Sequence, residues 1–359
     1  MTMLFDVPFL PDAGYAAFLG ERVDRLHSLH FRLEGEHLLD SRHGFGNWSE
    51  GDLLTRLREI QGPRKYALLN SRIYAPGRYF DPTFWSGLTA RLARLVEAGQ
   101  LDGVVFADQY LLQGLADAAP DLCATLEAVP SANCLVDTSE GIVAWRQYVA
   151  EAGFLPPTKI ILDRNLNRDP ARLAQIAKRC RQQYPGLVLT LLGNEGCLYR
   201  CPFKLAHDAH IALANTGLTP DRCGPINDSF GCRRYFSAHP EAVLQSPLIR
   251  PEDVERYHGV VEVVKLCGRT LGVEFLQKVV DAYLRGSFAG NMLELADTTS
   301  WLAEQMYVAN ELLPEDFFDR VTTCQMGCAK CGYCLQVFKE CVKKQPLRLK
   351  DWRRQGNLQ

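Results

Sequence analysis

Between residues 66 and 286 the chain alternates short apolar runs with longer amphipathic stretches. The apolar runs are rich in Val, Ile and Leu, as buried parallel strands are. The amphipathic stretches repeat their leucines at helical spacing, and Leu88, Leu92 and Leu95 are an example. Strands that alternate with helices of this length predict right-handed βαβ units and a parallel sheet.

The pattern predicts the position of each element. We expect strands at residues 25–33, 65–74, 102–108, 131–137, 158–164, 186–192 and 261–266. We expect helices between them at residues 81–99, 109–119, 140–153, 169–184 and 272–286. One more strand, the seventh in order, is expected within the irregular stretch 216–248, which brings the number to about eight. This number favours a closed (β/α)8 TIM-like barrel over an open doubly wound sheet, and no G-x-G-x-x-G follows a strand.

The pattern changes near residue 300. Residues 299–313 have a helical pattern, and a cysteine-rich segment and a basic tail follow. We therefore expect a barrel over residues 1–300 and a small, mainly helical, cysteine-rich appendage over residues 301–359. Such an appendage is too small to fold unaided without a metal.

Composition narrows the class of protein. The 359 residues are 47% hydrophobic and 23% charged, with a formal net charge of −2. These values are typical of a soluble globular protein and argue against a protein that mainly coats nucleic acid. The start of the chain lacks the basic region of a signal peptide, and no apolar run is long enough for a bilayer. We expect a cytoplasmic protein without membrane partners, whose basic tail could contact RNA.

Thirteen cysteines are many for such a chain. In a reducing cytoplasm they favour metal ligands or catalytic groups over disulfides. Cys123, Cys134 and Cys180 lie in apolar or helical stretches and are expected to be buried. The other ten form two groups: the first is Cys197, Cys201, Cys223, Cys232 and Cys267, and the second is Cys324, Cys328, Cys331, Cys334 and Cys341.

The first group begins directly after the expected strand 186–192, which places it at the mouth of a barrel. Pro202 suits the start of a helix, whose free amides favour a nearby thiolate. Gathered thiolates predict zinc or an iron–sulfur cluster, with a redox dithiol as a third alternative. We expect ligands in Cys197, Cys201 and Cys232. The fourth is Cys223 or Cys267, and Cys267 is favoured because it ends a strand at the same mouth.

The second group has the spacing C-x3-C-x2-C-x2-C, from Cys324 to Cys334. Such close repeats favour an iron–sulfur cluster over zinc, which usually takes two C-x-x-C pairs across a longer loop. The role of Cys341 as a ligand stays open. The first three cysteines also match the spacing of radical S-adenosylmethionine enzymes. In those enzymes the motif follows the first barrel strand, so its position here disfavours radical chemistry.

Polar residues at the strand ends complete the predicted site. Arg164 stands out, because a helix cap does not need a guanidinium. Asp108 could act in catalysis or simply cap a helix, and His207 could donate a proton or pack in the core. We take the catalytic candidates to be Arg164, His207 and Asp108, and the substrate-binding candidates to be Asn133, Lys265, Arg269 and Asn194.

Three segments resemble the collagenase-like peptidase family of the unclassified "U" type. They are KIILDRNLN, NEGCLYRCP and VVEVVKLCGRTLGVEFLQKVVDAYLRG, in which Lys265, Gly268 and Arg269 match a family pattern. The resemblance covers roughly residues 100–290. It implies a barrel that holds a [4Fe-4S] cluster by four cysteines, and for several members an oxygen-independent hydroxylation of RNA bases or ubiquinone precursors. The chain departs from the family in its C-x3-C spacing, in Cys267 where an acid is usual, and in its extra second group.

The sequence therefore predicts an iron–sulfur oxidoreductase with two [4Fe-4S] clusters. Its substrate would be an anionic small molecule or RNA, and the C-terminal cluster would pass on electrons. The expected protein partner is an electron donor or a homologous iron–sulfur protein. A non-catalytic electron-transfer or assembly partner is the alternative. A peptidase is disfavoured, because the chain lacks H-E-x-x-H and G-x-S-x-G and because ligated cysteines cannot act as nucleophiles.

Overall fold

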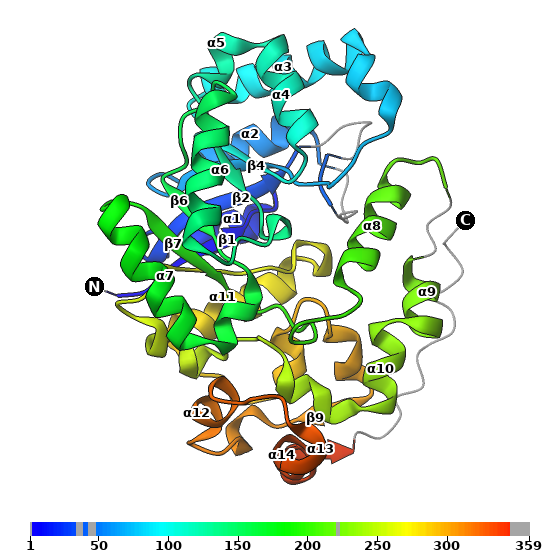
Figure 1. The fold of residues 1–359 in the computed structure, drawn as a ribbon. Coiled ribbons are helices and arrows are strands. Elements are labelled where there is room, and N and C mark those ends of the chain that lie inside the picture. The colour runs from blue at the N-terminus through cyan, green and yellow to red at the C-terminus, as the bar shows by residue number, and fades with distance from the viewer. Residues whose placement is uncertain (1, 34–38, 42–47, 220–222, 345–359) are drawn as a thin grey trace.

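Parallel strands form the centre of the molecule (Figure 1). The structure is a computed structural model that describes residues 2–33, 39–41, 48–219 and 223–344. The strands of its large sheet are β1 (Leu4–Pro8), β2 (Leu26–Arg32), β3 (Arg64–Leu69), β4 (Gly103–Phe106), β5 (Glu127–Pro130), β6 (Lys159–Ile161), β7 (Val188–Leu192) and β8 (Val263–Lys265). Their hydrogen-bonded order is β5-β4-β3-β2-β1-β8-β7-β6, and every pairing is parallel. This is the order of a (β/α)8 barrel, so the predicted fold class is confirmed.

Side chains bridge the one seam of the barrel, between β5 and β6. The backbone contributes a single bridge there, from Glu127 to Leu155. The buried Glu127 carboxylate accepts hydrogen bonds from the Thr158 backbone N–H at 3.3 Å and from the Tyr66 hydroxyl at 3.0 Å. Arg64 pairs with the same carboxylate and donates to the Thr158 hydroxyl at 2.7 Å. Polar contacts thus close the barrel where the strand ladder is interrupted.

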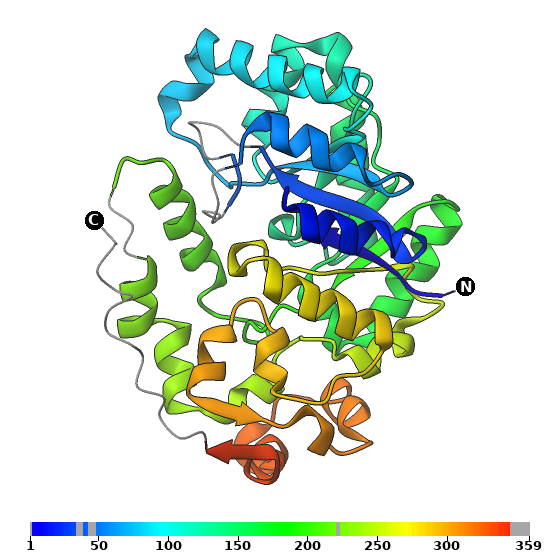
Figure 2. The ribbon, with the colours of Figure 1, turned by 180° about the vertical axis from the view of Figure 1, so that it is seen from behind.

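Helices surround the strands and extend the molecule on one side. They are α1 (Ala13–Gly20), α2 (Glu50–Arg58), α3 (Pro82–Glu97), α4 (Gln109–Ala118), α5 (Pro120–Cys123), α6 (Ser139–Glu151), α7 (Pro170–Gln183), α8 (Lys204–Asn215), α9 (Cys223–Phe230), α10 (Cys232–Ala238), α11 (Val273–Arg285), α12 (Phe317–Thr322), α13 (Cys328–Cys331) and α14 (Tyr333–Cys341). Figures 1 and 2 show α8–α10 as a layer along one side of the barrel and α12–α14 together at one end. Among the described helices, none has both the length and the apolar character to cross a membrane.

The structure corrects several sequence assignments. The expected helices are present as α3, α4, α6, α7 and α11. The strand expected within 216–248 is wrong, because the described part of that stretch forms helices; the unassigned strand is β1, at the N-terminus. The strand expected at 131–137 is also wrong: β5 lies just before it, and residues 132–134 form a 3₁₀ turn. The helix expected over 299–313 is wrong too, since it is broken by the strand β9 (Met306–Val308).

Two layers fill the interior of the barrel. One is charged: Lys159 donates to Asp6 at 2.8 Å and to Ser28 at 2.6 Å, and Ser28 donates to Asp6 at 2.6 Å. Burial opposes ionisation of Asp6, but Lys159 and His27 hold the pKa of this carboxyl well below its usual range. The other layer is apolar and is formed by Tyr66, Leu68, Val105, Val129, Ile161 and Leu192.

The C-terminal elements share a hydrophobic core with the segment after β7. Val308, Phe338 and Cys341 cluster there with Leu198 and Phe236. The strand β10 (Val342–Lys344) pairs antiparallel with β9 and ties the chain end to this core. The predicted division at residue 300 stays a prediction, and residues 345–359 of the predicted appendage lie outside the described residues.

We expect Glu127→Ala to lower the free energy of unfolding by about 2–4 kcal/mol, because the buried Tyr66 hydroxyl and the Thr158 amide lose their acceptor. Urea unfolding followed by circular dichroism measures this change. Glu140→Ala removes a carboxylate from an exposed ion pair with Arg179 and should leave the midpoint unchanged. Equal midpoints for the two variants would contradict the role of Glu127 at the seam.

Candidate functional site

A cavity of about 490 Å³ lies at the mouth of the barrel. Its wall combines strand-end residues such as Asn133 and Arg164 with side chains of α8–α10 and of residues 297–301. The volume is in the range of small-molecule sites. The position, where strands run into their following loops, is the one at which barrels of this type carry their chemistry.

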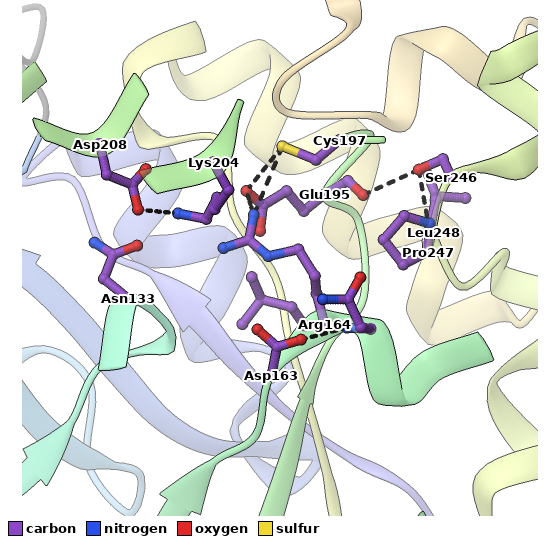
Figure 3. A network of polar contacts seen from close by, with 12 residues as sticks. Asn133, Asp163, Arg164, Glu195, Cys197, Lys204, Asp208, Ser246, Pro247 and Leu248 are labelled. Atoms are coloured by element: carbon purple, nitrogen blue, oxygen red, sulfur yellow. Dashed lines mark hydrogen bonds and ion pairs between the residues drawn. The ribbon is translucent and has the colours of Figure 1, made fainter. Parts of the chain in front are cut away.

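A buried ion pair joins the ends of β6 and β7 in this wall. Arg164 follows β6 and pairs with Glu195, which follows β7 (Figure 3). Arg164 also donates to the Cys197 sulfur at 3.6 Å, and the Cys197 thiol donates to Glu195 at 3.4 Å. Burial disfavours the charged guanidinium, but Glu195 more than offsets it and raises the pKa of Arg164. The Arg164 guanidinium therefore stays charged, and its contacts hold Cys197 at the cavity.

A second charged cluster lies on α8. Lys204 pairs with Asp208 one turn along the helix, and Arg72 reaches the same carboxylate at 3.3 Å. Arg72 also donates to the backbone carbonyl of Asn133. Burial lowers the pKa of Lys204, and the nearby Arg164 lowers it further. Cations outnumber carboxylates among these residues and the Arg164 pair, so this wall suits an anionic group.

Four cysteines of the first group line this one cavity. They are Cys197, Cys201, Cys223 and Cys232. The fifth, Cys267, instead lines a smaller neighbouring cavity together with Lys265. Burial raises the pKa of Cys197 to about 12 and also raises that of Cys201 and Cys232. The Phe203 backbone N–H and Lys204 partly oppose this shift at Cys201, as the predicted helix start implies.

Four cysteines of the second group line another cavity, of about 430 Å³. They are Cys324, Cys328, Cys331 and Cys334. Burial raises the pKa of Cys334 to about 11, while the buried Arg168 guanidinium lowers it. The other three thiols also act on Cys334, so the four lie close to one another. Cys341 lies apart and donates to the Leu312 carbonyl at 3.1 Å.

Both C-x3-C loops contain a residue in the left-handed region. Arg200 lies between Cys197 and Cys201 with φ of 49°, and Met326 between Cys324 and Cys328 with φ of 61°. Such conformations are uncommon for residues other than glycine and concentrate at functional sites. The Met326 backbone N–H donates to the Cys324 sulfur at 3.3 Å. In the first loop, the Arg200 backbone N–H instead donates to the Asn165 side chain at 2.8 Å.

The donor chemistry of both cysteine sets fits a metal centre, and their spacing bears on its kind. Within the described ranges, no three His, Cys, Asp or Glu side chains converge closely enough to hold a single metal ion. A cubane cluster needs its four thiolates farther apart than a single zinc ion does. The four thiols around each cavity supply the type and number of donors that such a cluster takes.

Three predicted site residues, Asp108, Asn194 and Arg269, make contacts that hold the structure together. Asp108 caps α4 through the Tyr110 and Leu111 amides and does not line either mouth cavity. The buried Asn194 amide donates to the Cys267 and Leu295 carbonyls, both at 3.0 Å, and so joins two loops.

Arg269 is bound by Asp40, with a distance of 2.6 Å from Nε to Oδ2. Of the other candidates, Asn133 and His207 line the main cavity, and Lys265 lines the smaller one, as Arg269 does too. Burial lowers the pKa of Lys265 to about 7.

Sequence reasoning missed Lys204, Asp208 and Arg72 as site residues. A signal was present for two of them, because Lys204 and Asp208 stand four apart on the helix that follows Pro202. Arg72 follows the strand-end residues Asn70 and Ser71, but an arginine in a loop is not distinctive. Only the fold shows that it reaches α8.

The comparisons agree with the family resemblance. The uncharacterized protease MJ1657 of Methanocaldococcus jannaschii is 28% identical over 271 residues, which cover 74% of each chain. The names of this relative and of the structural neighbour described next match the predicted resemblance to the U-type peptidase family. A solved structure titled as that of the U32 peptidase Mk0906 covers 74% of this chain and 92% of its own, with a TM-score of 0.47 and 16% identity. No family model matches the chain.

Thiol reactivity should differ sharply between the cysteines of the metal-free protein. At pH 7.5 we expect the exposed Cys328 and Cys331 to react with iodoacetamide at least about tenfold faster than Cys197, which is less exposed and whose raised pKa keeps the thiol protonated. Quenched alkylation followed by peptide mass spectrometry measures the rates. A fast Cys197 would indicate a nucleophilic thiolate and favour a peptidase.

The Arg164–Glu195 pair should show strong coupling. Arg164→Met strands the buried Glu195 carboxylate and should cost about 3–5 kcal/mol of unfolding free energy. The double variant Arg164→Met with Glu195→Gln leaves no stranded charge and should be more stable than Arg164→Met alone. Urea unfolding of the four proteins gives the cycle, and additive effects would contradict a coupled pair.

Proposed function

We propose that the chain is an iron–sulfur oxidoreductase that modifies an anionic small molecule or RNA at the barrel mouth, by oxygen-independent hydroxylation or a related redox step. One observation carries the proposal: each of two cavities is lined by four cysteines, and the first of these cavities also holds buried cations. Cys197, Cys201, Cys223 and Cys232 would hold one [4Fe-4S] cluster. Cys324, Cys328, Cys331 and Cys334 would hold the other.

A bound [4Fe-4S] cluster supplies one-electron redox chemistry. The chain's own groups would bind and orient the substrate next to it. Lys204 and Arg72 offer cations to an anionic group, and Asn133 lies beside them in the same wall. His207 lines the cavity and would move a proton to or from the substrate. The Arg164–Glu195 pair would keep the Cys197 loop in place during turnover.

The exposure of the second group favours a role in electron entry. Cys328 and Cys331 are exposed, whereas Cys197 is only partly exposed and lines the main cavity. An electron-donor protein could approach the second site directly. The same exposure also favours the alternative, a non-catalytic electron-transfer or assembly partner. The cation-lined main cavity supports the enzyme, because a carrier does not need a substrate pocket.

The protease name of the archaeal relative makes a peptidase the other reading to weigh. A cysteine peptidase needs a thiolate beside a base. The Cys197 thiol instead has a raised pKa and donates to a carboxylate. Its surroundings therefore favour a protonated thiol in the metal-free chain and not a nucleophile.

Anaerobic reconstitution tests the proposal. We expect about eight iron and eight sulfide per chain, enough for two cubane clusters. Cys201→Ala and Cys331→Ala should each lose about half, because each removes a ligand from a different site. Cys180→Ala is the matched control, since Cys180 is buried on α7 away from both cavities, and it should keep all its iron. Zinc in place of iron, or full iron in both ligand variants, would refute the assignment.

A further inference from the structure

A second, smaller cavity of about 80 Å³ lies in the barrel next to the main one. Its lining includes the apolar interior residues Leu68, Val105 and Ile161, and the polar residues His30 and Lys265. Arg164 and Glu195 line both cavities, so their ion pair stands between the two. This axial cavity takes no part in the proposed cluster chemistry. It has room for several waters or a small organic group, but not for a base or a sugar.

His30 in this axial cavity lacks polar partners. Its side chain is only 2% exposed, and neither ring nitrogen has a hydrogen-bond partner among the residues that the structure describes. Burial lowers the pKa of His30 well below its usual range, and Lys265 and Arg269 lower it further. The imidazole is thus neutral and carries one N–H donor. A buried donor without a partner is costly, which points to a partner that binds there.

Other cations of the barrel have a polar partner: the buried Lys65, for example, donates to Gln100 at 2.6 Å. Lys159 is paired with Asp6, Arg164 with Glu195, and Arg269 with Asp40. Lys265 is buried on β8 and lines the axial cavity, but no ion pair within the described part of the chain reaches it. Asp6 and Cys267 act on Lys265 electrostatically without an ion pair, and burial lowers its pKa to about 7. An anion bound beside Lys265 would favour its charged form.

We propose that the axial cavity binds a short carboxylate, with one oxygen accepting from Lys265 and the other from the His30 N–H. The two carboxylate oxygens would satisfy the two groups that the protein leaves without partners, and Leu68, Val105 and Ile161 would contact a short alkyl end. The ligand is either a free small acid or the carboxyl group of a larger molecule that extends past Arg164 into the main cavity. The site does not depend on the iron–sulfur assignment.

Binding of sodium acetate and of 4-phenylbutyrate to the full-length chain tests this site. The chain carries ring-¹⁵N histidine, the ionic strength is held constant, and NMR and thermal unfolding are the readouts. We expect saturable binding that shifts the His30 resonance, which His30→Gln identifies by its loss. Lys265→Met should weaken the affinity about 10- to 100-fold. The control Lys278→Met removes an exposed lysine paired with Glu294 and should bind like the wild type.

Comparing acetate with 4-phenylbutyrate distinguishes a free small acid from the carboxyl group of a larger molecule. Acetate binding as tight as that of 4-phenylbutyrate supports a free small acid. Binding of 4-phenylbutyrate that is much tighter, and still weakened by Lys265→Met, supports the carboxyl group of a larger molecule. If neither ligand shifts His30 or raises the unfolding temperature in the wild type, the cavity holds only water and the proposal is overturned. Iron content plays no part in these readouts, so failure here leaves the iron–sulfur proposal standing.

Discussion

The buried ion pair between Arg164 and Glu195 is the constraint on which the candidate site depends. Each charge would be costly inside the protein without the other, so neither can leave alone. Because the two residues follow neighbouring strands, the pair holds the ends of β6 and β7 in register. It also holds Cys197 and separates the main cavity from the axial one. This one ion pair therefore positions the Cys197 thiol and part of the wall between the main cavity and the axial cavity.

Much of the barrel could be predicted because its strands are apolar runs between amphipathic helices. The strand β1 escaped detection for a physical reason. Its sequence, Leu4–Pro8, carries a charge at Asp6, which looks unsuited to a core. Asp6 is compensated by Lys159, a residue 153 positions away, and local sequence does not reveal such a partner. In the same way, residues 131–137 look β-rich, although the strand that pairs with β4 is the run just before them.

The residue types that form the candidate site could be predicted from the sequence. The roles of the individual residues could be predicted only in part. Cys324, Cys328, Cys331 and Cys334 recur at short intervals and line one cavity, whereas Cys223 and Cys232 line the cavity of Cys197 and Cys201 although they lie far along the chain from them. Asp108 and Asn194 follow strands as site residues do, yet their side chains satisfy backbone groups. Cys267 ends a strand at the mouth, but the structure places it in the axial cavity and places Cys223 with Cys197, Cys201 and Cys232. The packing around a loop determines which cavity its side chains face. The position of the preceding strand does not determine this on its own.

Iron anomalous scattering from anaerobically grown crystals of the full-length protein tests the central claim most directly. The account predicts two separate iron sites. One lies among Cys197, Cys201, Cys223 and Cys232, and the other among Cys324, Cys328, Cys331 and Cys334. Anomalous signal at the zinc edge instead of the iron edge in these cavities, or iron that is coordinated by neither set of cysteines, would contradict it.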